Sequence, residues 1–163
     1  MKIVGLEEVW RLSPTQLAGW NILSIRGRMH AALSFPGAAS AKTLHFDDVE
    51  ADCPETGEFA ATAADIQAAI EFSREIGDEP LLVHCAAGVS RSTAIAWIII
   101  YDKLKREPDA VRRSFDIVRR LRPILSPNLH VLKLGVEALI PNTSRKKIVQ
   151  QFQDCLDELN LRA

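Results

Sequence analysis

The stretch from Leu81 to Ser92 constrains the fold of this chain more than any other part of the sequence. The sequence there is LLVHCAAGVSRS, and the almost wholly apolar run Thr93–Tyr101 follows at once. A short apolar run, a segment with a glycine and a longer apolar run predict a buried strand, a tight turn and a buried helix. The stretch therefore predicts a strand–turn–helix unit in the middle of an α/β domain.

The predicted turn has the composition of an anion site. Its backbone N–H groups are expected at a helix N-terminus, where they stabilise negative charge. Gly88 lets the backbone turn where a side chain would clash, and the Arg91 guanidinium can donate two parallel hydrogen bonds to a phosphate. Cys85 is expected at the base of the loop, where a thiolate beneath a bound phosphate is a nucleophile positioned for attack. A Cys85 that serves only in packing is the alternative, but it leaves Gly88 and Arg91 without a role.

The segment HCAAGVSRS resembles the signature of the cysteine-based protein tyrosine phosphatases, His-Cys-five residues-Arg-Ser/Thr, and is most similar to its dual-specificity form. The resemblance extends over roughly residues 44–140. It implies a single α/β domain over residues 1–163, with a central, mostly parallel sheet flanked by helices. The phosphate-binding loop is then expected between a central strand and a buried helix. The implied activity is phosphomonoester hydrolysis through a phosphocysteine intermediate, with no metal or other cofactor.

The resemblance also implies a role for each residue of the signature. Cys85 is expected to be the nucleophile, Arg91 to bind the phosphate, and Ser92 to donate a hydrogen bond to the sulfur. His84 is expected to support the thiolate. The substrate phosphate is expected to contact the loop itself, which comprises Ala86, Ala87, Gly88, Val89, Ser90 and Arg91.

The reaction needs a proton donor for the leaving oxygen, and an acidic loop before Cys85 offers three aspartates. In the resembled family this acid is an Asp on a loop that follows a strand. We expect Asp48 to be the acid, because it comes just after the strand Leu44–Phe46, whose alternation directs both end residues into the core. Asp52 is the alternative, since its separation from Cys85 is closer to that of many dual-specificity enzymes. Asp47 is the third candidate.

The side chains of the loop bear on the substrate. Ala86, Ala87, Val89 and Ser90 carry no charge, whereas members of the resembled family that take polyphosphorylated inositols usually have basic residues there. A phosphorylated protein or a small phosphomonoester is therefore the expected substrate. Two other functions stay open: a catalytically weak phosphate- or phosphoprotein-binding module, and a thiol-redox or sulfur-transfer enzyme. His84 and Ser92 argue against the second of these.

Composition narrows the remaining possibilities. The three cysteines are unclustered, which favours a reducing cytoplasm and excludes a disulfide framework or a zinc site. The longest apolar run, Ala94–Tyr101, is too short to cross a membrane, and no signal-peptide pattern opens the chain. Neither a net charge of −1 nor the arginine-rich helix expected at 109–122, which lacks interleaved aromatics, indicates a nucleic-acid partner. Cys53 is a candidate to form a reversible disulfide with Cys85.

Periodicity, caps and breakers predict the other elements. An edge strand is expected over residues 1–10, and further strands at Asn21–Ile25 and Thr43–Phe46, with a loop over 29–42. Helices are expected to begin at Ser13-Pro14 and at Thr62, the second stopping at Gly77. Further helices are expected at Leu129–Leu139 and at about 144–161. The last of these is expected to pack on its own domain or on a second copy, and the oligomeric state stays open.

Overall fold

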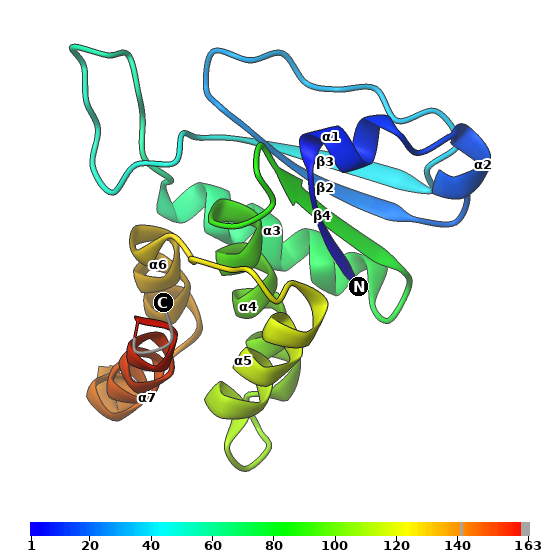
Figure 1. The fold of residues 1–163 in the computed structure, drawn as a ribbon. Coiled ribbons are helices and arrows are strands. Elements are labelled where there is room, and N and C mark those ends of the chain that lie inside the picture. Colours follow the sequence, from blue (N-terminus) through cyan, green and yellow to red (C-terminus); the bar gives the residue numbers. More distant parts are fainter. Residues whose placement is uncertain (141, 161–163) are drawn as a thin grey trace.

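A four-stranded, all-parallel sheet forms the centre of the computed structural model, which describes residues 1–140 and 142–160 (Figure 1). The strands are β1 (Lys2–Gly5), β2 (Asn21–Arg26), β3 (Ser40–His45) and β4 (Leu81–Cys85), in the order β1-β4-β2-β3. The helices are α1 (Leu6–Trp10), α2 (Pro14–Leu17), α3 (Ala63–Ile76), α4 (Arg91–Leu104), α5 (Ala110–Leu121), α6 (Leu129–Leu139) and α7 (Asn142–Asn160). The prediction of a small α/β domain with a mostly parallel sheet is confirmed.

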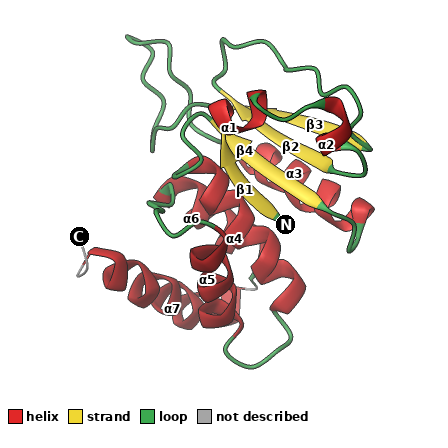
Figure 2. Ribbon diagram, turned by 45° about the vertical axis from the view of Figure 1, so that its right-hand side comes forward, coloured by secondary structure: helices red, strands yellow, loops and turns green. Residues whose placement is uncertain are grey.

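The helices form a thin layer on one face of the sheet and a thick one on the other (Figure 2). Alternate residues of β4 point to opposite faces of the sheet. Leu82 packs with Val9 of α1 and Leu17 of α2, whereas Leu81 and Val83 belong to the large core around α4. This alternation is the usual period of two in a strand that is covered on both faces. It directs Cys85, two residues after Val83, to the same side as α4.

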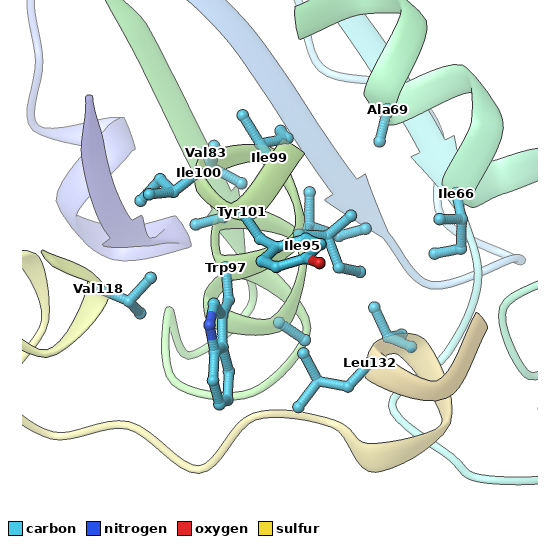
Figure 3. Packing of buried hydrophobic residues seen from close by; sticks show 14 of the residues in the cluster. Ile66, Ala69, Val83, Ile95, Trp97, Ile99, Ile100, Tyr101, Val118 and Leu132 are labelled. Carbon is cyan, nitrogen blue, oxygen red and sulfur yellow. The ribbon is translucent and has the colours of Figure 1, made fainter. Parts of the chain in front are cut away.

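Helix α4 lies in the middle of the thick layer, and every residue from Arg91 to Tyr101 is buried. Trp97 is its centre: the indole Nε1 donates to Ser114 Oγ at 2.9 Å, and the ring lies 5.1 Å from that of Phe115 and 4.6 Å from that of Phe152, between centroids. Figure 3 shows Trp97 among other buried hydrophobic residues of the core, which include Val118 and Leu132. The prediction of a buried helix after the signature is confirmed, and Phe152 brings α7 onto this core.

Several element boundaries follow from local hydrogen bonds. The edge strand β1 stops at Gly5 because the Gly5 N–H donates to Glu8 Oε2 at 2.7 Å, which starts α1 where the sequence predicted continued strand. Ser40 Oγ donates to Asn21 Oδ1 at 2.6 Å, so β3 begins three residues before the predicted Thr43. Thr62 accepts from the Asp65 N–H, and Gly77 ends α3 at φ 61°, as predicted.

The predicted C-terminal helix begins at Asn142, two residues earlier than expected, and the predicted end at Leu161 lies outside the described residues. Over residues 1–140 and 142–160, no helix combines the length and the apolar character that crossing a membrane requires.

Candidate active site

The loop of the signature joins the end of β4 to the start of α4 at the carboxyl edge of the sheet. Cys85 is the last residue of β4 and Arg91 the first of α4, and both are buried. Because β4 is an interior strand, its loop opens into the edge of the sheet where parallel α/β folds bind ligands. The predicted placement of the loop between a central strand and a buried helix is therefore confirmed.

The carbonyl groups of the loop are bound from outside. The Leu6 N–H donates to Ala86 O at 2.9 Å, Arg122 Nη2 donates to Ala87 O at 3.2 Å, and the Ser126 N–H donates to Val89 O at 3.0 Å. A trans peptide directs its N–H away from its carbonyl, so the next N–H along the chain faces the opposite way. The Gly88 N–H, which follows the carbonyl held by Arg122, donates to Cys85 Sγ at 3.3 Å. The sulfur therefore lies on the side of the loop that the N–H groups face.

Gly88 is required by both conformation and space. Its φ is 73°, a region that L side chains rarely adopt, and an added Cβ would come within 2.5 Å of the Val4 carbonyl carbon and the Gly5 nitrogen. Gly5 plays the matching part in β1, since a Cβ there would lie 3.0 Å from Ala87 O. The loop and the end of β1 thus pack backbone against backbone.

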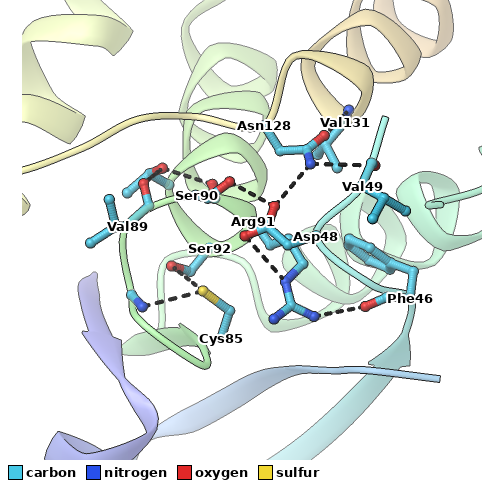
Figure 4. Close-up of polar contacts among 12 residues, drawn as sticks. Phe46, Asp48, Val49, Cys85, Val89, Ser90, Arg91, Ser92, Asn128 and Val131 are labelled. Atoms are coloured by element: carbon cyan, nitrogen blue, oxygen red, sulfur yellow. Dashed lines mark hydrogen bonds and ion pairs between the residues drawn. The ribbon is translucent and has the colours of Figure 1, made fainter. Parts of the chain in front are cut away.

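Cys85 Sγ has two polar neighbours within the loop and the helix that follows. Ser92 Oγ lies at 3.2 Å and the Gly88 nitrogen at 3.3 Å (Figure 4). Both groups carry a hydrogen that a thiolate can accept. The structure brings Cys85, Gly88 and Ser92 together.

Arg91 is held so that its guanidinium lies between the loop and the end of β3. Its Nη1 donates to Phe46 O at 2.8 Å, and its Nε lies 3.8 Å from Asp48 Oδ2. The Nε is buried and has no hydrogen-bond partner among the described residues. An arginine anchored by one nitrogen keeps further N–H groups for the oxygens of an anion.

Of the three candidate acids, the structure brings Asp48 to the loop. Its Oδ1 accepts from Ser90 Oγ at 2.7 Å and from Asn128 Nδ2 at 2.9 Å (Figure 4). Asp47 and Asp52 instead accept backbone N–H groups of their own segment, from Phe59 at 3.0 Å and from Ala60 at 2.9 Å. The two rival carboxylates therefore have local structural partners.

Asn128 is a site residue that the sequence analysis did not single out. Its Oδ1 accepts the Val131 N–H at 3.0 Å and so caps α6, while its Nδ2 donates to Asp48. An Asn at the start of a predicted helix is a common cap. Only the fold shows that its free amide end reaches the acidic loop.

His84 lies away from the sulfur. Its ring makes an edge contact with Phe35, at 5.6 Å between centroids, on the face of the sheet opposite α4. Burial lowers the pKa of His84 to about 4, opposed in part by the backbone of Cys85 and reinforced by the charge of Arg26. His84 is therefore neutral near pH 7 and contributes no positive charge to the loop.

Cys53 has its polar contacts within its own loop. Its Sγ lies 3.5 Å from Glu55 Oε2 and its backbone pairs with Glu58, while all three cysteines are free. This loop extends away from the sheet in Figure 1. No group of three or more His, Cys, Asp or Glu residues suited to a metal occurs in the part of the chain that the structure describes.

Comparisons with known proteins agree with this geometry. A family model described as protein-tyrosine phosphatase matches residues 48–124, and no curated protein matches the sequence. Among solved structures, the Yvh1 phosphatase domain from Chaetomium thermophilum is 20% identical with a TM-score of 0.57, covering 81% of this chain and 85% of that one. The human tyrosine phosphatase-like serine/threonine/tyrosine-interacting protein is 21% identical with a TM-score of 0.55, covering 81% and 80%. DUSP15 is 23% identical with a TM-score of 0.54, covering 93% and 89%. At these identities the structures show a shared fold.

Proposed function

The chain belongs to the cysteine-based protein tyrosine phosphatase superfamily, and from this premise we propose that it hydrolyses phosphomonoesters through a phosphocysteine on Cys85. One observation carries the proposal: the Cys85 sulfur, which accepts from the Gly88 N–H, the Arg91 guanidinium and the Asp48 carboxylate lie at a single loop. These are a nucleophile, a phosphate ligand and a proton donor, the three groups that the chemistry needs.

In the first step the loop N–H groups and Arg91 bind the three non-bridging oxygens of the phosphoryl group. Their hydrogen bonds stabilise the charge on these oxygens in the transition state. The Cys85 thiolate attacks phosphorus opposite the leaving oxygen, so that an S–P bond forms while the P–O bond to the substrate breaks. Asp48, in its protonated form, gives its proton to that oxygen, and the dephosphorylated alcohol or phenol departs.

In the second step a water molecule attacks the phosphocysteine. Asp48, now a carboxylate, takes a proton from this water as the new P–O bond forms. The S–P bond breaks and Cys85 leaves as a thiolate. Ser92, 3.2 Å from the sulfur, donates a hydrogen bond that stabilises this leaving group.

We infer the substrate class from the lining of the loop. The side chains of Ala86, Ala87, Val89 and Ser90 are uncharged, which favours a singly phosphorylated group. Phosphorylated proteins and small phosphomonoesters remain the proposed substrates, with no cofactor.

The test is hydrolysis of para-nitrophenyl phosphate across pH by wild type, Cys85→Ser, Asp48→Ala and Asp52→Ala. We expect Cys85→Ser to abolish turnover. Asp48→Ala should lower kcat by about 10²-fold or more and remove the pH limb that requires a protonated acid. Asp52→Ala is the matched control, because it removes a carboxylate of the same loop that binds the Ala60 N–H.

Hydrolysis retained by Cys85→Ser would refute the proposal. A loss of the acid limb in Asp52→Ala instead of Asp48→Ala would refute the assignment of the acid alone. Wild-type protein that binds vanadate without turnover would be a phosphate-binding module. Thiocyanate formation or arsenate reduction by the wild type would indicate the sulfur-transfer or thiol-redox alternative.

A further inference from the structure

A cavity of about 580 Å³ adjoins the candidate active site, on the side of α6 and α7. One end is formed by Asp48 and Ser90, the pair joined by a 2.7 Å hydrogen bond beside the phosphate loop. The volume is within the range of about 300–1,000 Å³ that is typical of ligand sites. We call this space the α7 cavity.

The far wall of the α7 cavity is fixed to the core. It consists of Leu156 and Leu159 on α7, and the adjacent Phe152 and Cys155 are buried against the domain. Phe152 packs on Trp97, and Glu158 forms an ion pair with Arg112 of α5. Leu156 and Leu159 thus form a wall in a set position relative to the phosphate loop.

The position of the α7 cavity determines what can enter it. A phosphoryl group on the loop has its leaving oxygen near Asp48, if Asp48 is the acid. The group attached to that oxygen must then leave the loop past Asp48 and Ser90, and both of these residues line the α7 cavity. The molecule that carries the phosphoryl group is therefore the natural occupant.

The lining distinguishes between a polypeptide and a lipid surface. The lining is mixed: the charged side chains are Asp48 and Glu50, the uncharged polar ones are Ser90, Ser126, Asn128 and Gln153, and the apolar ones are Leu125, Pro127, Leu129, Leu156 and Leu159. None of the described residues that line the cavity is Lys or Arg. Two carboxylates beside the opening repel an anionic membrane surface, which basic residues attract. The leucines of the far wall, Leu156 and Leu159, instead offer apolar surface to one side chain of a polypeptide, and the carboxylates favour a chain without acidic neighbours.

We propose that the α7 cavity binds an apolar side chain of the phosphorylated polypeptide substrate, close in sequence to the phosphorylated residue. The inference rests on the proposed function, because it requires phosphate to bind in the loop above Cys85. It narrows the substrate from any phosphomonoester to a phosphoprotein. Leu125, Leu129 and Leu156 become specificity-determining residues.

The experiment measures binding without turnover. Cys85→Ser protein is titrated with fluorescein-labelled phosphotyrosine heptapeptides in an alanine background. Each peptide has a single leucine at one position on either side of the phosphotyrosine, and binding is followed by anisotropy. We expect at least one leucine peptide to bind about tenfold more tightly than the all-alanine peptide. Its unphosphorylated form should bind much more weakly.

Two further substitutions in the Cys85→Ser protein locate the site. Leu129→Asp puts a charge into the α7 cavity at a residue that is 49% exposed, in the first turn of α6, where an Asp is favourable to the helix. Val149→Asp is the matched control, because Val149 is 46% exposed on α7 and lies outside the α7 cavity. The preference for leucine should disappear in Leu129→Asp and persist in Val149→Asp.

Equal affinity for all peptides, or a leucine preference that Leu129→Asp retains, would overturn the inference. If the Cys85→Ser protein binds vesicles that contain phosphoinositide but binds none of the peptides, the inference is overturned in favour of a lipid substrate. The proposed function is measured separately, by para-nitrophenyl phosphate turnover in wild type. Turnover without a leucine preference refutes the α7 cavity proposal alone, and a leucine preference without turnover refutes the hydrolase proposal alone.

Discussion

Gly88→Ala is expected to damage both stability and activity, and Gly19→Ala provides its internal control. Both glycines have a positive φ, 73° at Gly88 and 76° at Gly19. In this conformation an alanine destabilises the folded state by about 1–2 kcal/mol. It also lowers the entropy of the unfolded chain, which offsets about 0.4–1 kcal/mol of that loss. Gly19→Ala meets no atom within 4 Å. We therefore expect it to lower the free energy of unfolding by about 1 kcal/mol.

At Gly88 the added Cβ has no room. It would lie 2.5 Å from the Val4 carbonyl carbon and 2.5 Å from the Gly5 nitrogen, about 1 Å inside ordinary contact. Both atoms are backbone, so β1 or the loop must shift, at a cost of about 1–3 kcal/mol. The total loss is about 2–4 kcal/mol, a large share of the stability of a small domain.

The same displacement moves the N–H groups that face Cys85. A misplacement of about 1 Å in an active site can cost about 10²-fold in rate. Urea unfolding gives the free energies of both variants, and para-nitrophenyl phosphate turnover below the transition gives kcat/KM. The reasoning is refuted if Gly88→Ala loses no more stability than Gly19→Ala, or if its kcat/KM stays within about twofold of wild type.

Two other predictions concern the core and the strand beneath the loop. Phe152→Ala should lower the free energy of unfolding by about 3–5 kcal/mol, because Phe152 is buried against Trp97. Urea unfolding measures this loss, and a value below about 1 kcal/mol would mean that α7 does not pack on Trp97. His84 has a folded pKa near 4, below its unfolded value, so the unfolded state takes up the proton first as pH falls. Stability should therefore decline from about pH 6.5 towards pH 4, by about 1.4 kcal/mol per unit, and more steeply than in His84→Gln; parallel pH profiles of urea unfolding would contradict this.

The strand–loop–helix unit was predictable because its determinants are local. Apolar runs on either side of HCAAGVSRS indicate β4 and α4 without knowledge of the rest of the chain. The cap at Thr62 and the stop at Gly77 are likewise properties of a few adjacent residues. Such local patterns indicate the same secondary structure whatever tertiary contacts surround them.

The choice among the three aspartates was not local. Asp48 is distinguished by Ser90 and by Asn128, which lies 80 residues further along the chain. Asp52 seemed a close rival because sequence separation from Cys85 was the available measure, and separation does not fix the path of an irregular loop. The position of α7 was open for the same reason, since it depends on Phe152 meeting Trp97 across the core.

The geometry of the loop depends on residues that the signature does not contain. Its carbonyls are held by Leu6, Arg122 and Ser126, which come from three separate segments. Arg122 also pairs with Glu8, whose carboxylate accepts the Gly5 N–H that ends β1. Because each peptide directs its N–H away from its carbonyl, binding the Ala87 carbonyl from outside leaves the Gly88 N–H to donate to the sulfur. The signature thus supplies the reacting groups, and the surrounding fold gives the loop the orientation in which these groups can bind a phosphate.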